Sequence, residues 1–284
     1  MKKKTSNRKA RSARRRHVVI GLLPIFILAL YVALYARDNH SPNQGTPAEI
    51  ITDARLADVI IPDDQPEIMA EYTGFKVSFN PARHIPNYVI WELTGTEAEG
   101  QLPRSSRFFQ DTDVYGCATP DDYRNSGFDR GHMAPAADMK WSEQAMTDSH
   151  AMTNICPQDH ALNSGRWSTL EKKCRQWAQR DSALWIICGP VLTDHMPQTI
   201  GNGVSVPRRF FKVILAPYAT PMRAIGFIMP NSYTDEQLEQ LACSVDQVEK
   251  ITGYDFFSSL PDSIENSIES SENLRLWNRN KRQK

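Results

Sequence analysis

The sequence predicts an α+β fold in which helices pack on a mainly antiparallel central sheet. Three observations support this class. Four apolar segments rich in Val, Ile, Phe and Trp are bounded by Pro or Gly, and two longer segments carry apolar residues at helical spacing. In addition, 40% of the 284 residues are hydrophobic, which is enough for a substantial core. We therefore expect one folded domain, with its remaining segments serving as linkers or tails.

The N-terminal segment predicts a membrane anchor. Residues 1–17 carry nine basic and no acidic residues, and the following 19 residues, 18–36, carry no charge. A helix of that length, at about 1.5 Å per residue, spans a bilayer core. The basic flank places residues 1–17 in the cytoplasm, so the rest of the chain is exported, as at a bacterial inner membrane facing the periplasm.

Two alternatives for the N-terminal segment remain open. A cleaved signal peptide would make the protein secreted, but the segment is long, and Leu34 stands where a small residue is expected three positions before a cleavage site after Ala36. A mitochondrial presequence is the second alternative, against which the abundant lysine and the long uncharged span argue.

The remaining chain divides into a polar linker (37–54), a folded domain (55–262) and a polar tail (263–284) that we expect to be frayed. In chain order, the predicted strands are 88–93, 185–192, 210–215 and 224–229. The predicted helices are 163–180 and 234–252, with a shorter one near 142–148.

Charge and cysteine content restrict the function classes. Nine of the 33 basic residues lie in residues 1–17, leaving 24 basic against 33 acidic residues in the rest. An acidic body argues against a protein that coats nucleic acid, so phosphate binding would need a local basic cleft. The five cysteines lack the paired spacing of a zinc ribbon, and both disulfides and buried thiols remain open.

One segment, 129–138, combines an arginine and a histidine in the pattern that phosphodiester hydrolysis requires. His132 suits a general base because the ordinary pKa of imidazole lies near neutrality, and Arg130 offers a planar fork to phosphate oxygens. Asn163, at the start of a predicted helix, offers a neutral oxygen ligand to Mg²⁺. Glu171 lies eight residues further, about 80° from eclipsed on a helix, where a metal-bound water can bridge the two.

Each of these residues also fits an ordinary structural role. A single histidine is usually a surface or core residue, and Asn163 is as good a helix N-cap as a metal ligand. Glu171 precedes two lysines and fits a solvated helix face, and Arg130 has acidic neighbours with which to pair. The combination, rather than any single residue, points to a nuclease.

The combination resembles the non-specific DNA/RNA endonucleases, the endonuclease G family. The resemblance rests on Asp129-Arg130-Gly131-His132 and the five residues that follow it. It continues through segment 153–158, Asn163, Trp167 and Glu171, and includes the upstream segments 104–108, 122–123 and 126–128. It covers roughly residues 70–255.

The resemblance implies a ββα-metal (His-Me finger) site, with two short strands carrying His132 and a helix that begins at Asn163. It assigns His132 as the proton acceptor and Asn163 as the sole direct protein ligand of Mg²⁺, with Mn²⁺ as the alternative ion. Glu171 would hold metal-bound waters, and Arg130 would contact the phosphate or the leaving group.

The resemblance also implies substrate contacts and partners. Its substrate-binding residues would be Asn154, Asp129 and one upstream arginine, either Arg104 or Arg107, of which we favour Arg107. The substrates would be DNA and RNA, bound through the phosphate backbone with little sequence preference. Relatives in the family are often dimers, so a homodimer is a candidate assembly.

An alternative of a different class is a membrane-tethered protein that binds or takes up nucleic acid without hydrolysis. The presence of His132, Asn163 and Glu171 argues against it, because a binding protein needs no base to activate water.

Overall fold

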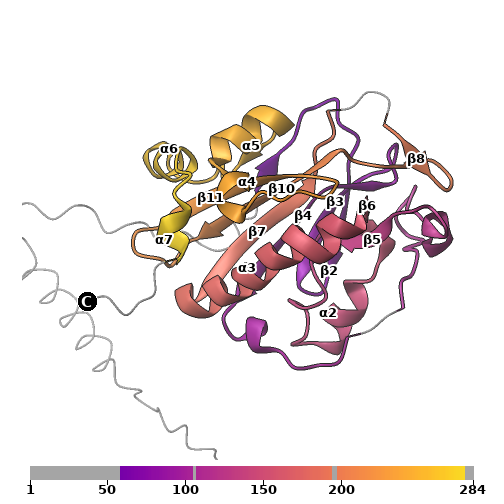
Figure 1. The fold of residues 1–284 in the computed structure, drawn as a ribbon, viewed down its shortest axis with the longest axis horizontal. Helices are drawn as coiled ribbons and strands as arrows, with labels where there is room; N and C mark the ends of the chain where they lie inside the picture. Colours follow the sequence, from indigo (N-terminus) through magenta and orange to yellow (C-terminus); the bar gives the residue numbers. More distant parts are fainter. Residues whose placement is uncertain (1–57, 105–106, 194–196, 279–284) are drawn as a thin grey trace, which may run out of the picture. The chain divides into compact units, whose positions relative to one another are not determined.

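The centre of the molecule is a seven-stranded sheet in which every neighbouring pair of strands is antiparallel (Figure 1). The computed structural model describes residues 58–104, 107–193 and 197–278. The strand order is β12-β11-β10-β7-β4-β3-β2. In chain order the strands are β2 (Ile68–Tyr72), β3 (Phe75–Asn80), β4 (Ile85–Thr94), β7 (Ala183–Pro190), β10 (Arg209–Ala216), β11 (Arg223–Pro230) and β12 (Ala242–Cys243). The mixed fold with an antiparallel sheet confirms the α+β prediction.

The four predicted strands are β4, β7, β10 and β11, the central strands of this sheet. The hairpin of β2 and β3 is not among the predicted elements. In β3 the polar residues Ser78 and Asn80 are buried beside the apolar ones, which hides the alternation that identifies a strand.

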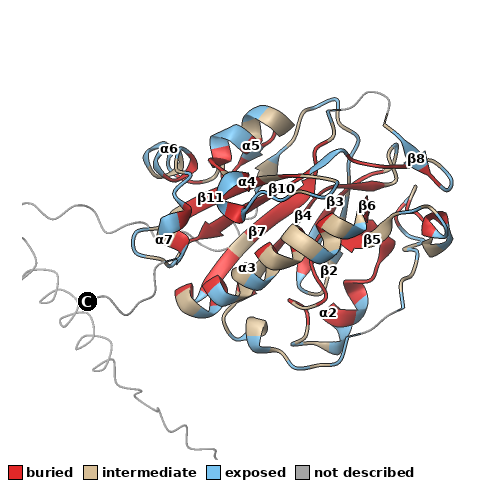
Figure 2. Cartoon of the chain, in the orientation of Figure 1, coloured by how far each residue is buried: buried red, intermediate tan, exposed pale blue. Residues whose placement is uncertain are grey.

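The sheet is buried on both faces, and successive residues of a strand belong to different apolar clusters. On β7, Ile186 packs in a cluster with Leu170 of helix α3 (Ser168–Asp181). The next residue, Ile187, packs in a second cluster with Val248 of α5 (Val245–Thr252) and Ile268 of α6 (Asp262–Glu269). Figure 2 shows the central strands as buried and the helices as partly exposed. Helices therefore cover both faces, as continuous apolar strands predict.

The predicted helix 234–252 is wrong as a single element. The chain forms a short helix α4 (Leu238–Leu241), then strand β12, then α5. The Ser244 side chain accepts a hydrogen bond from the backbone N–H of Gln247 and so starts α5 anew. Pairing of Cys243 with Gly226 on β11 outweighs helical propensity at this point.

The tail is also more ordered than expected. Residues 263–278 contain most of α6 and all of α7 (Leu274–Asn278). Trp277 is 1% exposed, and its ring lies 5.0 Å from that of Trp177 on α3. Its backbone carbonyl accepts a hydrogen bond from Arg180. Burial of one large aromatic side chain stabilises the fold enough to hold this polar segment in place.

The remaining elements include the pair that carries the DRGH residues, β5 (Asp129–His132) and β6 (Ile155–Gln158). The helix predicted near 142–148 is α2 (Glu143–Asp148), capped by Ser142. The other strands are β1 (Val59–Ile60), β8 (Thr199–Ile200), β9 (Val204–Ser205) and β13 (Asp255–Phe256). The short helices are η2 (Glu97–Glu99), η3 (Pro120–Tyr123), η4 (Met152–Asn154) and η5 (Leu162–Trp167).

Two questions left open by the sequence concern cysteines and membrane spans. All five cysteines are buried free thiols. Of the two possibilities left open by the sequence, disulfides and buried thiols, the structure has buried thiols. Among the described residues, no helix combines the length and the apolar character that a bilayer crossing needs. The predicted anchor, 18–36, lies outside the described residues.

Candidate active site

The DRGH residues form a short antiparallel strand pair that packs against the start of α3. On β5, His132 is opposite Ile155 of β6, and Gly131 is opposite Cys156. A Cβ atom added at Gly131 would lie 2.1 Å from Oε1 of Gln158, so the close approach of the strands requires glycine. The indole N–H of Trp167 donates to the backbone carbonyl of His132 at 3.2 Å. The two strands and the helix are therefore joined directly at His132.

His132 is held in an aromatic environment, and the residue is only 7% exposed. Its ring centre lies 4.9 Å from that of His150, nearly perpendicular to it, and 5.3 Å from that of Phe108. Burial, then the neighbouring charges of His150 and Arg104, lower the pKa of His132 well below its usual range. The imidazole is therefore neutral near pH 7 and able to accept a proton.

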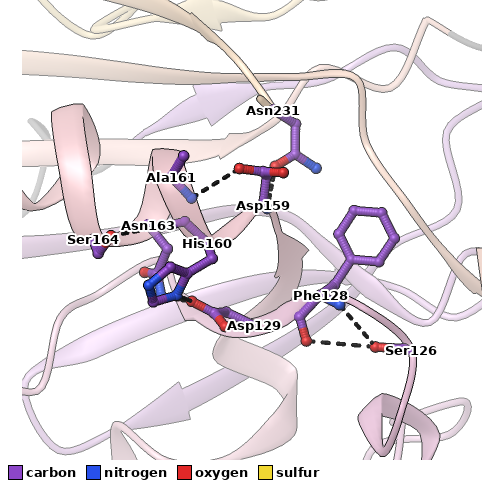
Figure 3. A network of polar contacts seen from close by, with 9 residues as sticks. All are labelled: Ser126, Phe128, Asp129, Asp159, His160, Ala161, Asn163, Ser164 and Asn231. Carbon is purple, nitrogen blue, oxygen red and sulfur yellow. Dashed lines mark hydrogen bonds and ion pairs between the residues drawn. The ribbon is translucent and has the colours of Figure 1, made fainter. Parts of the chain in front are cut away.

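The side chain of Asn163 is oriented by Asp129. Its amide nitrogen donates to Oδ2 of Asp129 at 2.9 Å, and Nδ1 of His160 lies 2.8 Å from the same oxygen (Figure 3). An amide whose N–H group is used in this way presents its carbonyl oxygen elsewhere. That oxygen is a suitable ligand for a hard divalent cation.

The backbone around Asn163 is fixed by a second polar network, visible in Figure 3. The backbone N–H of Asn163 donates to the carbonyl of Asp159 at 2.9 Å. The backbone N–H of Asp159 in turn donates to the side chain of Asn231 at 2.7 Å. Asn231 also donates to the backbone carbonyls of Pro157 and Pro207. These contacts fix the start of the helix relative to β6 and the central sheet.

The predicted residues converge on one pocket. Its volume is about 270 Å³, and its walls come from β5 and the residues that follow it, from η5, from the first turn of α3 and from Arg104. The lining residues are Arg104, Arg130, His132, Pro135, Ala136, Ala137, Asn163, Ser164, Ser168 and Glu171. The pocket thus contains the candidate base, the candidate metal ligands and two guanidinium groups.

The two arginines of the pocket differ in how they are held. The guanidinium group of Arg130 donates to the backbone carbonyl of Pro120 at 2.9 Å and lies 5.2 Å from the ring centre of Phe108. Arg104 is exposed and lines the pocket, whereas Arg107 is not among the lining residues. The geometry favours Arg104 over Arg107 as the upstream phosphate ligand, opposite to our sequence-based preference.

Two predicted substrate-binding residues have other contacts. Asn154 is fully buried, and its amide bonds to both backbone polar groups of Ala134 and to the carbonyl of Ser149. It holds the loop after His132 and is not among the residues that line the pocket, so a role in substrate binding stays a prediction. The carboxylate of Asp129 binds His160 and Asn163, so it positions a side chain and is not placed to contact an anionic substrate.

A buried charge network lies behind Glu171. Nζ of Lys212 on β10 is 4.2 Å from the ring centre of Trp167 and 5.1 Å from that of Trp91. Asp138 is buried and bonds to Arg175 at 2.7 Å. Burial raises the pKa of Glu171 to about 7, against the opposing influence of Lys212. The charge of Lys212 in the core therefore influences the protonation of Glu171 at the pocket.

Four neighbours of the site are not among the residues predicted from the sequence: His150, Phe108, Lys212 and Asp138. Phe108 and Asp138 lie in the segments 104–108 and 129–138 singled out above but received no role, and His150 lies in no recognisable spacing with His132. The fourth, Lys212, carries the one available signal, a lysine within a continuous apolar run. An unpaired buried ammonium group is costly, so such a lysine indicates a buried anionic neighbour.

Comparison with known proteins decides the family. Residues 57–263 match the DNA/RNA non-specific endonuclease family. The chain belongs to this family. As a member of the DNA/RNA non-specific endonucleases, the chain is 34% identical over 211 residues to mouse mitochondrial nuclease EXOG, covering 68% of this chain and 57% of that protein. It is 32% identical over 203 residues to bovine mitochondrial endonuclease G, covering 66% of this chain and 68% of that protein.

Two further relatives of this family member are informative. A nuclease from Nostoc is 29% identical over 243 residues, covering 81% of this chain and 83% of that protein. A crystal structure of an EndoG/EndoGI complex superimposes with a TM-score of 0.65 at 25% identity, covering 69% of this chain and 88% of that one. The chain spans only 57% of the mouse protein's length, so its own site must carry any assignment of activity and substrates.

We expect Lys212→Met to destabilise this endonuclease-family chain by about 2 kcal/mol, the value of a desolvated cation–π contact, because it removes the ammonium group that lies over Trp91 and Trp167. Urea denaturation at pH 7 measures the effect. The matched control is Lys76→Met on β3, where the lysine is 51% exposed and pairs with Glu71 at 2.8 Å. An exposed pair of this kind contributes under about 1 kcal/mol. Equal effects of the two substitutions would show that the buried ammonium group is dispensable.

Proposed function

We propose that this chain is a metal-dependent endonuclease that hydrolyses phosphodiester bonds of DNA and RNA with little sequence preference. The observation that carries the proposal is one pocket containing a neutral imidazole, an oriented amide oxygen and two guanidinium groups. Membership of the endonuclease family supports the same reaction class.

Each residue has a distinct part in the proposed reaction. His132 accepts a proton from the attacking water, because its lowered pKa leaves it unprotonated at neutral pH. Arg130 and Arg104 bind the nonbridging phosphate oxygens. Contacts of this kind recognise the backbone and not the bases, which accounts for low sequence preference.

The donor set fits a hard divalent cation, Mg²⁺ or Mn²⁺. Asn163 would hold the ion through its amide oxygen, and Glu171 would bind water molecules of its coordination shell. A bound ion of this kind supplies positive charge that stabilises the transition state and the leaving oxygen. Asp129 keeps Asn163 in the required orientation by accepting its N–H.

The direct test incubates the full chain, purified in detergent, with supercoiled plasmid and with a single-stranded RNA, with Mg²⁺ or with a chelator. We expect both substrates to be cut at internal bonds in the presence of Mg²⁺ only. The alternative, a tethered nucleic-acid-binding protein, predicts a mobility shift without any cuts. Cleavage that persists undiminished in the chelator would contradict the assignment of a metal.

We expect the rate at saturating Mg²⁺ to persist well below pH 6.5, the ordinary pKa of histidine. A base acts in its unprotonated form, so a pKa lowered by burial moves the acidic limit of activity to lower pH. The measurement is kcat from about pH 5 to pH 8, with thermal unfolding at each pH to show that the fold persists. Because the pKa of Glu171 is raised to about 7, the same profile is measured in Glu171→Gln, and an acidic limit at or above pH 6.5 that remains in this variant would disagree with a buried, neutral His132.

The location of the protein is a separate proposal. We propose that residues 18–36 anchor the chain in a membrane with the nuclease domain on the exported side. Mouse EXOG, bovine endonuclease G and a Saccharomyces cerevisiae nuclease are mitochondrial by name, which supports the mitochondrial alternative. Cell fractionation followed by alkaline extraction and protease treatment of intact membranes separates the two. Release of the chain by alkali would reject the anchor.

A further inference from the structure

A cluster of acidic side chains joins the two helices on the face of the sheet opposite α3. Asp246 and Glu249 lie one turn apart on α5, and Glu269 lies at the end of α6. One carboxylate oxygen from each residue lies within 4.8 Å of the other two. Asp246 is exposed, Glu249 is half-buried and Glu269 is buried, so the cluster is closed on one side and open to solvent on the other.

Glu269 is the unusual member of this cluster. It is 5% exposed, and its buried Oε1 has no hydrogen-bond partner among the described residues. Burial and the neighbouring carboxylates of Glu249 and Glu265 raise the pKa of Glu269 to about 9. A buried carboxylate without a partner is costly, so in a stable fold such an oxygen is expected to meet a proton or a cation.

The surroundings supply further acidic groups. Burial raises the pKa of Glu249, and the charges of Asp255 and Glu265 raise it further, while the backbone N–H of Phe256 donates to one of its oxygens at 2.9 Å. No lysine, arginine or histidine of the described residues forms an ion pair with any of the three carboxylates. The balancing charge is therefore not provided by the described part of the chain.

We propose that Asp246, Glu249 and Glu269 form a calcium site that fastens α6 to α5, separate from the catalytic pocket. All donors are carboxylate oxygens, the class that hard cations bind. Calcium holds oxygen ligands at about 2.3–2.6 Å, so ligands on opposite sides of an ion lie about 4.6–5.2 Å apart. The observed spacing of these oxygens, within 4.8 Å, matches that span. Water completes the shell on the open side, where Asp246 is exposed.

The proposed calcium site would stabilise the C-terminal helices and would take no part in phosphodiester hydrolysis. Ile268 of α6 and Val248 of α5 belong to the apolar cluster on this face, so the two helices already pack together. An ion between them removes the mutual repulsion of three carboxylates at the same junction. Calcium binding then resists separation of α6 from the sheet.

The first test counts calcium bound to the full chain by equilibrium dialysis, with Ca²⁺ up to about 10⁻³ M. The Asn163→Ala background removes the catalytic metal ligand, so that only the proposed site is counted. We expect one ion per chain in that background and none after adding Glu269→Gln. The control adds Glu272→Gln, an exposed glutamate outside the cluster, and should keep the ion. Unchanged binding in the Glu269→Gln variant would overturn the proposal.

The second test uses thermal unfolding, which also distinguishes a binding role from a packing role. Calcium should raise the Tm of the unmodified chain by several degrees, and neither Glu269→Gln nor Asp246→Asn should respond. In chelator, Glu269→Gln should unfold at the same temperature as the unmodified chain or higher, because an amide of the same shape replaces a carboxyl group whose charged form is disfavoured by burial. A calcium-induced rise in Tm that survives in both variants would refute the site. Loss of nuclease activity has no bearing on this outcome.

Discussion

His132→Ala is expected to lower the rate of plasmid cleavage by about 10²–10⁴-fold, the usual contribution of a general base. The reason is specific to the geometry: His132 is the one histidine among the described residues that line the pocket, and its neutral state at pH 7 follows from its burial. The measurement is kcat at saturating Mg²⁺ and substrate, because KM should change little if the phosphate contacts of Arg130 remain intact.

A matched control separates the loss of a base from damage to the fold. His84→Asn removes a histidine outside the pocket at a position with φ of 59°, which asparagine tolerates. This variant should keep the full rate. His132→Ala should remain folded by circular dichroism, with some loss of Tm because its ring packs against Phe108 and His150. Full activity in folded His132→Ala would remove the assigned base.

Asn163→Ala should reduce the rate and raise the Mg²⁺ concentration needed for half-maximal activity, each by at least about 10–100-fold. The variant removes the amide oxygen that Asp129 orients, while the half-buried position limits the structural cost. The measurement is a Mg²⁺ titration of the initial rate.

Two further variants make the Asn163 result specific. Asn278→Ala, at an exposed position on α7, should leave the titration unchanged. Asp129→Asn should shift it in the same direction as Asn163→Ala but by less, because the amide loses its orienting acceptor and keeps its own oxygen. A Mg²⁺ titration of Asn163→Ala that matches the unmodified chain would place the ligand elsewhere.

The helix that carries Glu171 shows how far sequence periodicity extends. The periodicity predicts one helix over 163–180, and α3 does cover 168–181. Its first turn, Leu162–Trp167, is wider, with Gly165 at φ −98° and ψ −110°. Periodicity indicates which side chains face the core, but the shape of a first turn depends on its surroundings. Here the chain entering that turn is held by the hydrogen bond from the backbone N–H of Asp159 to Asn231.

The interrupted helix and the ordered tail have the same physical cause. Local propensity favours a continuous helix through Ala242 and Cys243, yet these residues complete the edge of the sheet beside β11. Residues 263–278 are mostly polar, yet Trp277 finds a site between Trp177 and Arg223. In both cases, strand pairing or burial against distant residues outweighs the local secondary-structure preference. The sequence of a single segment does not show these distant contacts.

The sequence by itself determined the sheet's four central strands and the set of His132, Asn163, Glu171 and Arg130, because apolar runs and motif spacing are local properties of the chain. Only the tertiary structure decided which groups surround that set: His150 beside the imidazole, Asp129 bound to the amide, and the buried Lys212, whose charge opposes the raised pKa of Glu171. It likewise brought Glu269 to Asp246 and Glu249. Neighbours of this kind arise when distant segments pack together, and burial and charge then set the chemistry of each group.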